Sequence, residues 1–222
     1  EKNLLFLEKS FSNSPSFILD VENKEQLETL AKKIKEHTDQ VDGFLHSLAF
    51  ANFNPETPSF HQTTREDFLQ ACQISCFSLV EMANKILPLL ADNASIVTVG
   101  ISNTKATSYG YLGPIKAMLE ATVPYLAKSL GANSNIRVNC VAAGPLKTSA
   151  SAGIPNYIEN YLYSEALTLR KKALETKEVA QTICFLLSVN SSGINAETLT
   201  VDCGMNSNYF DQDIIKTYSK NL

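Results

Sequence analysis

The sequence predicts an α/β fold: a Rossmann-like, doubly wound parallel sheet with helices on both faces. Short apolar segments alternate with longer amphipathic segments along most of the 222 residues. The short segments are apolar throughout rather than at alternate positions, which is typical of strands covered on both faces. No repeat or low-complexity linker interrupts the alternation, so residues 1–222 are expected to form one domain.

The first elements follow in order from residue 16. The segment 16–21 (SFILDV) predicts a buried strand, and 23–37 spaces its aliphatic residues along one face of a helix. The segment 43–51 predicts a strand that runs into a loop. Thr63 and Glu66 have the spacing of a capping box, which predicts the start of the next helix.

The second half of the chain continues the alternation. The helix after Thr63 is expected to end near Ile86, because a proline follows shortly afterwards. The run 95–99 (SIVTV) predicts a strand, and a long helix then ends near Gly131, since glycine is favoured at helix C-caps. The remaining elements are two strands and two helices, at 136–142, 155–166, 177–188 and 198–202.

The composition predicts a folded protein without a nucleic-acid or metal site. Hydrophobic residues make up 44% and charged residues 19%, the net charge is -4, and no extended Lys/Arg run forms a basic face. The five cysteines contain no C-x2-C pair, and the three histidines are not at ligand spacing, so no metal is expected. We expect a soluble, cytoplasmic protein without a membrane segment, because unpaired thiols suit a reducing compartment and no long apolar run occurs.

The stretch 108–121 (SYGYLGPIKAMLEA) carries Tyr109 and Lys116 seven positions apart. On one helix this spacing is about two turns, roughly 10 Å, so both side chains could face one cleft. The tyrosine could donate to a substrate oxygen, and the lysine could bind a cofactor ribose or stabilise negative charge. Ordinary helices often carry the same pair, so spacing alone leaves both interpretations open.

The predicted topology brings further segments to the same place. Ligands of open α/β sheets bind at the carboxyl ends of the strands. The loops after Val21, His46, Val99 and Ala142 all fall at that edge.

Several motifs together resemble one family. HSLAFA (46–51), SIVTV, the run from Tyr109 to Ile154 and LTVDCG (199–204) closely resemble the enoyl-acyl-carrier-protein reductases of the short-chain dehydrogenase/reductase superfamily. That branch has Tyr-x6-Lys where most of the superfamily has Tyr-x3-Lys. No tyrosine in this sequence has a lysine four positions later, and the resemblance extends from about Asp20 to Gly204.

The resemblance implies reduction of the trans-2 double bond of an enoyl thioester, carried by acyl carrier protein, with NADH or NADPH in fatty acid synthesis. Tyr109 would hydrogen-bond the thioester oxygen and Lys116 would hold the nicotinamide ribose as the catalytic pair. The implied cofactor-binding residues are Asp20, Val21, Ser47, Leu48, Ala49, Lys116, Leu146 and Thr148. The implied substrate-binding residues are Phe50, Ile101, Leu112, Ile154 and Tyr157.

The resemblance also implies a lid and an oligomer. Residues 149–175 correspond to the segment that covers the acyl chain, and an apolar lid would exclude water during the reaction. The family further suggests a homotetramer, with helices 65–86 and 109–131 at one interface.

The sequence departs from the family at several places. No glycine-rich turn precedes residues 16–21, so the first two strands and first helix are absent from the printed chain, which we expect to be incomplete at its N terminus. Their absence would leave a gap in the sheet between the strands 16–21 and 43–51, unless the remaining strands rearrange or another chain fills it. Ile101 stands near a usual tyrosine, and Pro114 would be tolerated only in the first turn of a helix beginning near Leu112.

Two smaller departures are Ala196 and Cys203, which stand where the family usually has glycine. The absent glycine-rich turn, Ile101 and Pro114 favour an alternative function: a catalytically degenerate homologue that works as a binding or scaffold subunit. The intact Tyr-x6-Lys pair favours the enzyme.

Overall fold

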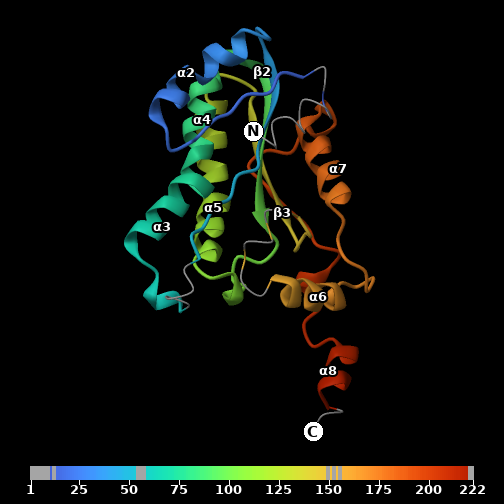
Figure 1. Ribbon diagram of the computed structural model, residues 1–222. Helices are drawn as coiled ribbons and strands as arrows, with labels where there is room; N and C mark the ends of the chain where they lie inside the picture. Colours follow the sequence, from blue (N-terminus) through green and yellow to red (C-terminus); the bar gives the residue numbers. More distant parts are fainter. Residues whose placement is uncertain are drawn as a thin grey trace.

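The computed structural model describes Phe11, Ser14, Ser151, Ile154 and the ranges 15–53, 59–148 and 157–219. In this part of the chain, four parallel strands form one sheet in the order β1-β2-β3-β4 (Figure 1). The strands are β1 (Val41–His46), β2 (Leu90–Ile101), β3 (Arg137–Ala143) and β4 (Thr198–Val201). The predicted α/β class and the parallel sheet are confirmed.

Helices cover both faces of this sheet. Figure 1 shows α2, α4 and α5 on one side of the strands and α7 on the other. The helices are α2 (Lys24–Lys35), α3 (Arg65–Cys72), α4 (Ser78–Ile86), α5 (Leu112–Gly131), α6 (Tyr157–Leu167), α7 (Thr176–Leu187) and α8 (Gln212–Ser219). None of the helices in the described ranges is long and apolar enough to span a membrane.

Each face of the sheet has its own apolar core. On one face, Ile96 and Val138 pack with Leu119 of α5, and all three are fully buried. On the other, Val97 and Val141 pack beneath α7. All seven positions of β3 are buried, as expected for a strand covered on both faces, and its two polar residues, Arg137 and Asn139, donate to main-chain oxygens.

A π-helical turn, Gln73–Phe77, joins α3 to α4. A π turn accommodates an extra residue within an otherwise α-helical segment. This turn and the first residue of α4 bring Ser75 and Ser78 to the buried side, where neither side chain is exposed. The sequence predicted one uninterrupted helix here.

The prediction of a strand at 16–21 is wrong. The segment has no strand partner in the described chain, and its Phe17 and Ile18 side chains are 38% and 62% exposed. Its Asp20 N–H donates to the Gln26 side chain instead of to a sheet neighbour. A strand needs a neighbour for its backbone groups, so apolar composition alone did not produce one. Within the described residues, β1 is therefore at the edge of the sheet, and no gap separates it from a strand at 16–21.

The helix boundaries need smaller corrections. Thr64, not Thr63, caps α3, and its side chain accepts from the N–H of Asp67. The helix that contains Lys116 begins at Leu112 as expected, so Pro114 lies in its first turn, where a missing N–H breaks no helical hydrogen bond. Gly131 is the last residue of α5 rather than its cap.

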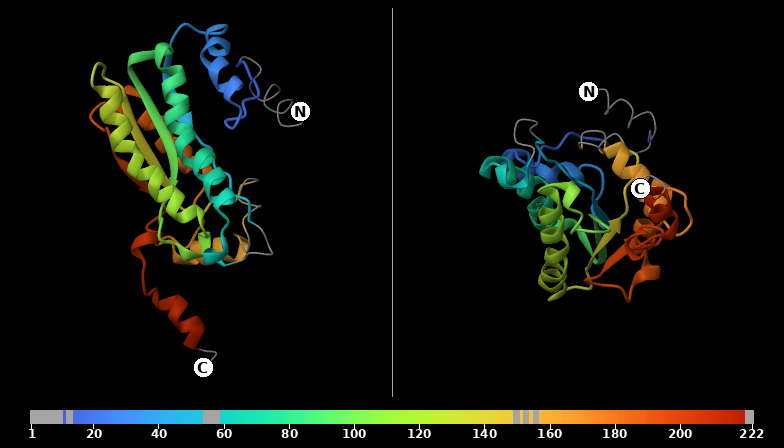
Figure 2. Two further views of the ribbon diagram at one scale, coloured as in Figure 1. Left: turned by 90° about the vertical axis from the view of Figure 1, so that its left-hand side faces the viewer. Right: turned by 90° about the horizontal axis from the view of Figure 1, so that it is seen from below.

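The C-terminal helix α8 does not pack on the sheet. Figure 2 shows α8 projecting beyond the end of the sheet near α6. A salt bridge between Lys171 and Asp211 anchors its base, and Asn208 donates to the main-chain oxygen of Leu167 at 2.7 Å.

Candidate active site

The candidate site lies where β1, β2 and β3 end. Ile101 is paired with Ala143 at the ends of β2 and β3, and His46 at the end of β1 is paired with Thr98. The loops that leave these strands contain most of the predicted site residues, and α5 runs beneath them. The topology thus gathers the candidate residues at one edge, as predicted for an open α/β sheet.

Lys116 lies in the second turn of α5, and only 4% of the residue is exposed. Its Nζ donates to the main-chain oxygen of Val99 at 2.8 Å and to that of Leu48 at 3.3 Å. These acceptors belong to the end of β2 and the loop after β1, so the ammonium group connects two neighbouring strand ends. An ammonium has three donors, so one N–H is left for a ligand.

The charge of Lys116 is set by its surroundings. Burial lowers the pKa of Lys116 to about 8, against the raising influence of Cys140, Cys76 and Glu120. A group with that pKa is mostly cationic at neutral pH and loses its charge in mildly alkaline solution.

Tyr109 ends a short 3-10 helix, Thr107–Tyr109, just before α5. The next residue, Gly110, has φ +60, a left-handed conformation that glycine adopts without strain and that turns the chain into α5. Burial raises the pKa of Tyr109 to about 12, and the nearby Tyr157 adds to the rise. The phenol therefore keeps its proton at neutral pH and can act as a hydrogen-bond donor.

His46 forms a buried network below the loop after β1. Its Nδ1 lies 2.8 Å from Thr98 Oγ1 and its Nε2 lies 2.8 Å from Ser78 Oγ. Ser78 donates its own proton to the main-chain oxygen of Ile74, so Nε2 must be the donor to Ser78 and Nδ1 the acceptor from Thr98. Burial, with the nearby charge of Lys116, lowers the pKa of His46 to about 4. The ring is thus neutral and holds β1, β2 and α4 together.

Ser75 of the π turn fixes the loop after β1 at Phe50. Its Oγ accepts from the N–H of Phe50 at 2.8 Å and donates to the carbonyl oxygen of Phe50 at 3.0 Å. Both main-chain groups of one loop residue are therefore satisfied by one fully buried hydroxyl. The clamp fixes the path of residues 47–50, which include the predicted cofactor residues Ser47, Leu48 and Ala49.

The loop after β3 is joined to α6. Tyr157 donates its hydroxyl to the main-chain oxygen of Leu146 at 2.7 Å. Within the loop, the N–H of Thr148 donates to Ser151 Oγ at 3.0 Å, and the N–H of Ser151 donates back to Thr148 Oγ1 at 3.2 Å. Ile154 accepts from the N–H of Tyr157 through its main-chain oxygen. Residues 149–150, 152–153 and 155–156 of the predicted lid lie outside the described residues.

Four further predicted site residues, Ile101, Leu112, Asp20 and Val21, lie in the described part of the chain. Ile101 is half-buried at the end of β2, whereas Leu112 is only 3% exposed and packs in the core. Asp20 forms a turn before α2, where its side chain accepts from the N–H of Glu22. Val21 is buried beside that turn. Their cofactor and substrate roles stay predictions.

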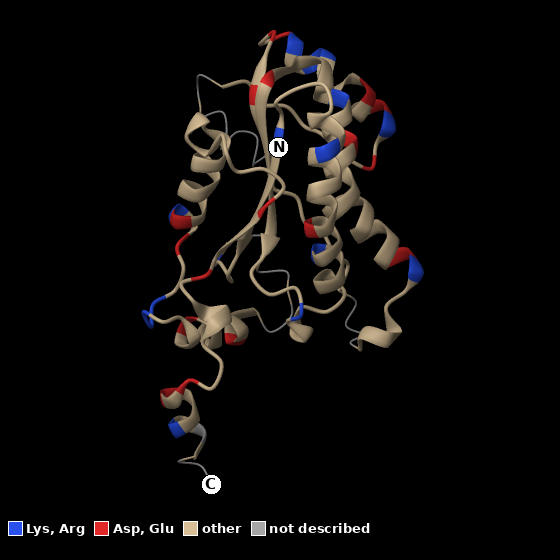
Figure 3. Cartoon of the chain, turned by 180° about the vertical axis from the view of Figure 1, so that it is seen from behind, with Lys and Arg blue, Asp and Glu red and all other residues tan. Residues whose placement is uncertain are grey.

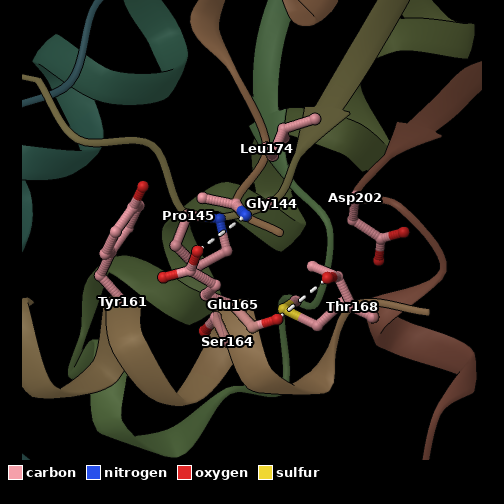
Figure 4. Close-up of a pocket in the computed structure, with 10 residues that line it drawn as sticks. Gly144, Pro145, Tyr161, Ser164, Glu165, Thr168, Leu174 and Asp202 are labelled. Carbon is pink, nitrogen blue, oxygen red and sulfur yellow. Dashed lines mark hydrogen bonds between the residues drawn. The ribbon is translucent and has the colours of Figure 1, made fainter. Parts of the chain in front are cut away.

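A small cavity of about 10 Å³, room for one water molecule, lies between α6 and the loop after β3 (Figure 4). Glu165 closes one side, where its carboxylate accepts from the N–H of Ala173 at 3.2 Å. None of the predicted site residues lines this cavity. It belongs to the packing of α6 on the sheet rather than to the candidate site.

The charged side chains do not form a patch of one sign over the candidate site. Figure 3 shows Lys and Arg interspersed with Asp and Glu over the helices. No group of three or more His, Cys, Asp or Glu side chains in the described ranges is placed to hold a metal ion. The buried ammonium of Lys116 and the protonated phenol of Tyr109 stay the predicted catalytic groups of this edge.

A nicotinamide cofactor fits part of this site. Lys116 has one N–H that could donate to a ribose hydroxyl, and Ser75 fixes the main chain of the loop after β1 at Phe50. The printed sequence has no glycine before Gly43, and the described residues hold no glycine-rich turn for a pyrophosphate. The described chain thus supplies the nicotinamide-ribose end of such a site.

Sequence reasoning missed the residues that hold the site in place. His46 and Ser75 were not singled out, and neither were Ser78 or Glu120. One signal was available: two serines three positions apart, Ser75 and Ser78, in an otherwise apolar helical run. Polar side chains on a buried helical face need partners, and their partners here are Phe50 and His46.

Known proteins resemble this chain in sequence and in structure. The model of the enoyl-(acyl carrier protein) reductase family matches residues 2–206. The enoyl-[acyl-carrier-protein] reductase [NADH] FabI of Nostoc sp. is 37% identical over 195 residues, which cover 86% of this chain and 75% of that protein. The corresponding [NADPH] FabI of Staphylococcus aureus is 36% identical over 191 residues, 85% of this chain and 74% of that protein.

A solved structure agrees with these relatives. The crystal structure of the Anaplasma phagocytophilum reductase in complex with NAD has a TM-score of 0.85 and 30% identity, and covers 93% of this chain and 79% of that one. The resemblance expected from Tyr-x6-Lys and its neighbouring motifs is confirmed. The chain belongs to the enoyl-(acyl carrier protein) reductase family, whose members are oxidoreductases acting on carbon–carbon double bonds.

Proposed function

We propose that this protein reduces the trans-2 double bond of an enoyl thioester on acyl carrier protein, using NADH or NADPH, in fatty acid synthesis. One observation carries the proposal: Lys116 is buried at the strand ends with its Nζ on Val99 and Leu48, and Tyr109 lies seven positions earlier, in the short 3-10 helix just before α5. A scaffold would need neither a buried ammonium nor a tyrosine of this kind at a loop edge.

Tyr109 supplies the hydrogen bond to the substrate oxygen. Because the pKa of Tyr109 is raised to about 12, its hydroxyl stays protonated across the neutral range. A donor fixed in a half-buried site stabilises negative charge that develops on the thioester oxygen more strongly than water does. Gly110 fixes the position of the hydroxyl by turning the chain directly after it.

Lys116 holds the ribose and adds positive charge beneath Tyr109. The cofactor, when bound, supplies the hydride for the reduction. Lys116 contributes its remaining N–H to a ribose hydroxyl, while Val99 and Leu48 keep the ammonium in place. Leu146 and Thr148, in the loop after β3, are proposed to line the nicotinamide side. The Nostoc relative is named for NADH and the S. aureus relative for NADPH, and NADH is proposed here as the first choice.

Residues 149–175 are proposed to form the lid over the acyl chain. In the described part of this segment, α6 presents Ile158 and Leu162, which are 69% and 57% exposed, and is tied to the loop after β3 by Tyr157. Apolar side chains at the mouth of a site suit an acyl chain and exclude water. Phe50, Ile101 and Ile154 are proposed to complete the acyl-binding surface.

We propose a homotetramer in which α3–α5 form one interface. Apolar side chains are exposed along these helices, among them Leu69, Phe77, Met118 and Tyr125. Figure 2 shows the α3–α4 segment and α5 running side by side, so these residues can form one surface. The proposed location is the cytoplasm, where the five free thiols would stay reduced.

The decisive test is turnover. The protein is purified from its natural source, its intact mass is recorded, and loss of NADH absorbance is followed with a trans-2-enoyl thioester. We expect turnover, with kcat lowered about 100-fold or more in Tyr109→Phe, since one proton donor contributes that much. The exposed Tyr209→Phe is the matched control. Binding of NADH without turnover would overturn the proposal and favour a binding subunit.

A further inference from the structure

A half-buried carboxyl group, that of Glu120, lies one turn beyond Lys116 on α5. Glu120 Oε1 is buried, and in the part of the chain that the structure describes it has no hydrogen-bond partner. The function proposed above gives this carboxylate no role. A buried carboxylate oxygen without a partner costs folding free energy, so its presence needs an explanation.

The backbone of β2 makes room for this carboxylate. A side-chain carbon added at Gly100 would lie 2.9 Å from Glu120 Oε1 and 2.9 Å from Cys140 Sγ. A larger residue at this position would force the Glu120 carboxylate and the Cys140 thiol to shift. The missing side chain of Gly100 therefore lets the Glu120 carboxylate lie on β2 next to Val99, whose main-chain oxygen accepts from Lys116.

No contact ion pair balances the charge of Lys116. Both acceptors of its Nζ are neutral main-chain oxygens, and no carboxylate in the described residues lies within salt-bridge distance of it. A buried ammonium with only neutral partners favours loss of its proton.

The other titratable groups around Lys116 are neutral at neutral pH. Burial raises the pKa of the Cys140 thiol to about 12 and also raises that of Cys76. The pKa of His46 is lowered to about 4, and that of Tyr109 is raised to about 12. Glu120 is the group left that can face Lys116 with a negative charge.

The state of Glu120 itself is the critical question. Burial raises the pKa of its carboxyl, whereas the Ile101 main chain and the charge of Lys116 oppose that rise. Lys116 and Glu120 thus favour each other's charged form from positions one helical turn apart.

We propose that Glu120 is a positioning residue whose negative charge keeps Lys116 protonated, and therefore able to donate to a ligand, at neutral pH. The link to cofactor binding rests on the function proposed above. The coupling between the two charges does not, and it can be measured in the protein alone.

The experiment is an NMR titration of the protein with labelled lysine and glutamate side chains, without cofactor. Lys116→Met identifies the Lys116 signal. We expect the Lys116 midpoint to fall by about one pH unit in Glu120→Gln, the low end of the roughly 1–3 units by which a nearby opposite charge shifts a pKa. Glu120→Asp keeps the charge and should restore most of the midpoint.

The matched control is Glu81→Gln. Glu81 lies on α4 and also has a buried carboxylate oxygen without a hydrogen-bond partner in the described chain. It is not among the groups that shift the pKa of Lys116, so its removal should leave the midpoint unchanged.

Two results would overturn the proposal. One is an unchanged Lys116 midpoint in Glu120→Gln. The other, read from the unsubstituted protein even if the variants fold poorly, is a Glu120 carboxyl that is still protonated at pH 7. A protein that shows the coupling but binds no NADH would instead contradict the proposed function.

Discussion

Tyr157 donates its hydroxyl to the main-chain oxygen of Leu146 at 2.7 Å, and this bond joins the first turn of α6 to the loop after β3. Tyr157 also stacks on Tyr161, with ring centroids 6.5 Å apart, and lies near Tyr109. The proposed lid is thus connected to the candidate catalytic residue by a side chain of its own. Movement of α6 would require this hydrogen bond to break.

Removing that hydroxyl should loosen the lid. In Tyr157→Phe we expect faster amide hydrogen exchange over the described part of α6 and a KM for the enoyl thioester raised about fivefold, from a bond contributing about 1 kcal/mol. Tyr163→Phe, which alters a half-exposed tyrosine on the same helix, should change neither quantity. Equal exchange rates in the two variants would show that the bond does not hold α6.

Cofactor affinity should depend on the charge of Lys116. The pKa of Lys116 is lowered to about 8, so NADH affinity should fall as the pH rises through 8 and the ammonium loses its proton. Lys116→Met should weaken binding by about 10- to 100-fold at neutral pH and abolish this pH dependence, since a hydrogen bond from a charged donor is lost. NADH fluorescence titrations between pH 6.5 and 9 test both effects.

The control for this prediction is Lys128→Met, an exposed lysine in the last turn of the same helix. It should retain the affinity and the pH dependence of the unsubstituted protein. If the NADH affinity of Lys116→Met still fell with rising pH, another group would be responsible for the pH dependence.

His46 should make stability depend on pH in mildly acidic solution. Its pKa is lowered from 6.5 to about 4, so the unfolded chain binds its proton first as the pH falls. The free energy of unfolding should therefore decrease between pH 6.5 and 4, by on the order of 3 kcal/mol from this group. Urea unfolding across this range should show a shallower decrease in His46→Gln, whereas the exposed His61→Gln should keep the full decrease. Parallel pH profiles would exclude His46 as the cause.

Ala196 adopts a backbone conformation that favours glycine. Its φ is +65, and its N–H donates to the main-chain oxygen of Val138 at 2.9 Å. Ala196→Gly should raise the free energy of unfolding by about 1 kcal/mol, because a left-handed alanine is strained by about that amount. Ala121→Gly, at an exposed position in the middle of α5, should lower it by about 0.5–1 kcal/mol. Thermal and urea unfolding of both variants measure the difference, and a destabilised Ala196→Gly would contradict the strain.

The local elements could be predicted from the sequence, and their partners could not. The helix at 24–35 and the strand at 95–99 follow from the spacing of apolar residues and a few end signals. The segment 16–21 has the composition of a strand, but a strand exists only beside another strand. The sequence also indicated that Ala196 and Cys203 replace glycines. In the structure both residues have positive φ, a backbone conformation that glycine adopts more easily.

The predicted catalytic residues could be identified from the sequence, but the residues that hold them in position could not. Tyr109 and Lys116 are recognisable from one short motif. The partners of His46 are 32 and 52 positions away, so no local pattern could identify them. Glu120 was overlooked because a glutamate one turn after a lysine is common on exposed helix faces, and only burial gives this pair a different meaning.

The π turn at Gln73–Phe77 controls the rotational phase of the segment that follows it. Each helical residue rotates the chain by about 100°, so removing one residue from the turn would rotate all of α4 relative to α3. Ser75 or Ser78 would then face away from its partner, whichever residue was deleted. The position of the loop that carries Leu48 thus depends on the number of residues in the segment Gln73–Phe77. Insertions or deletions in this segment should therefore be more damaging than substitutions.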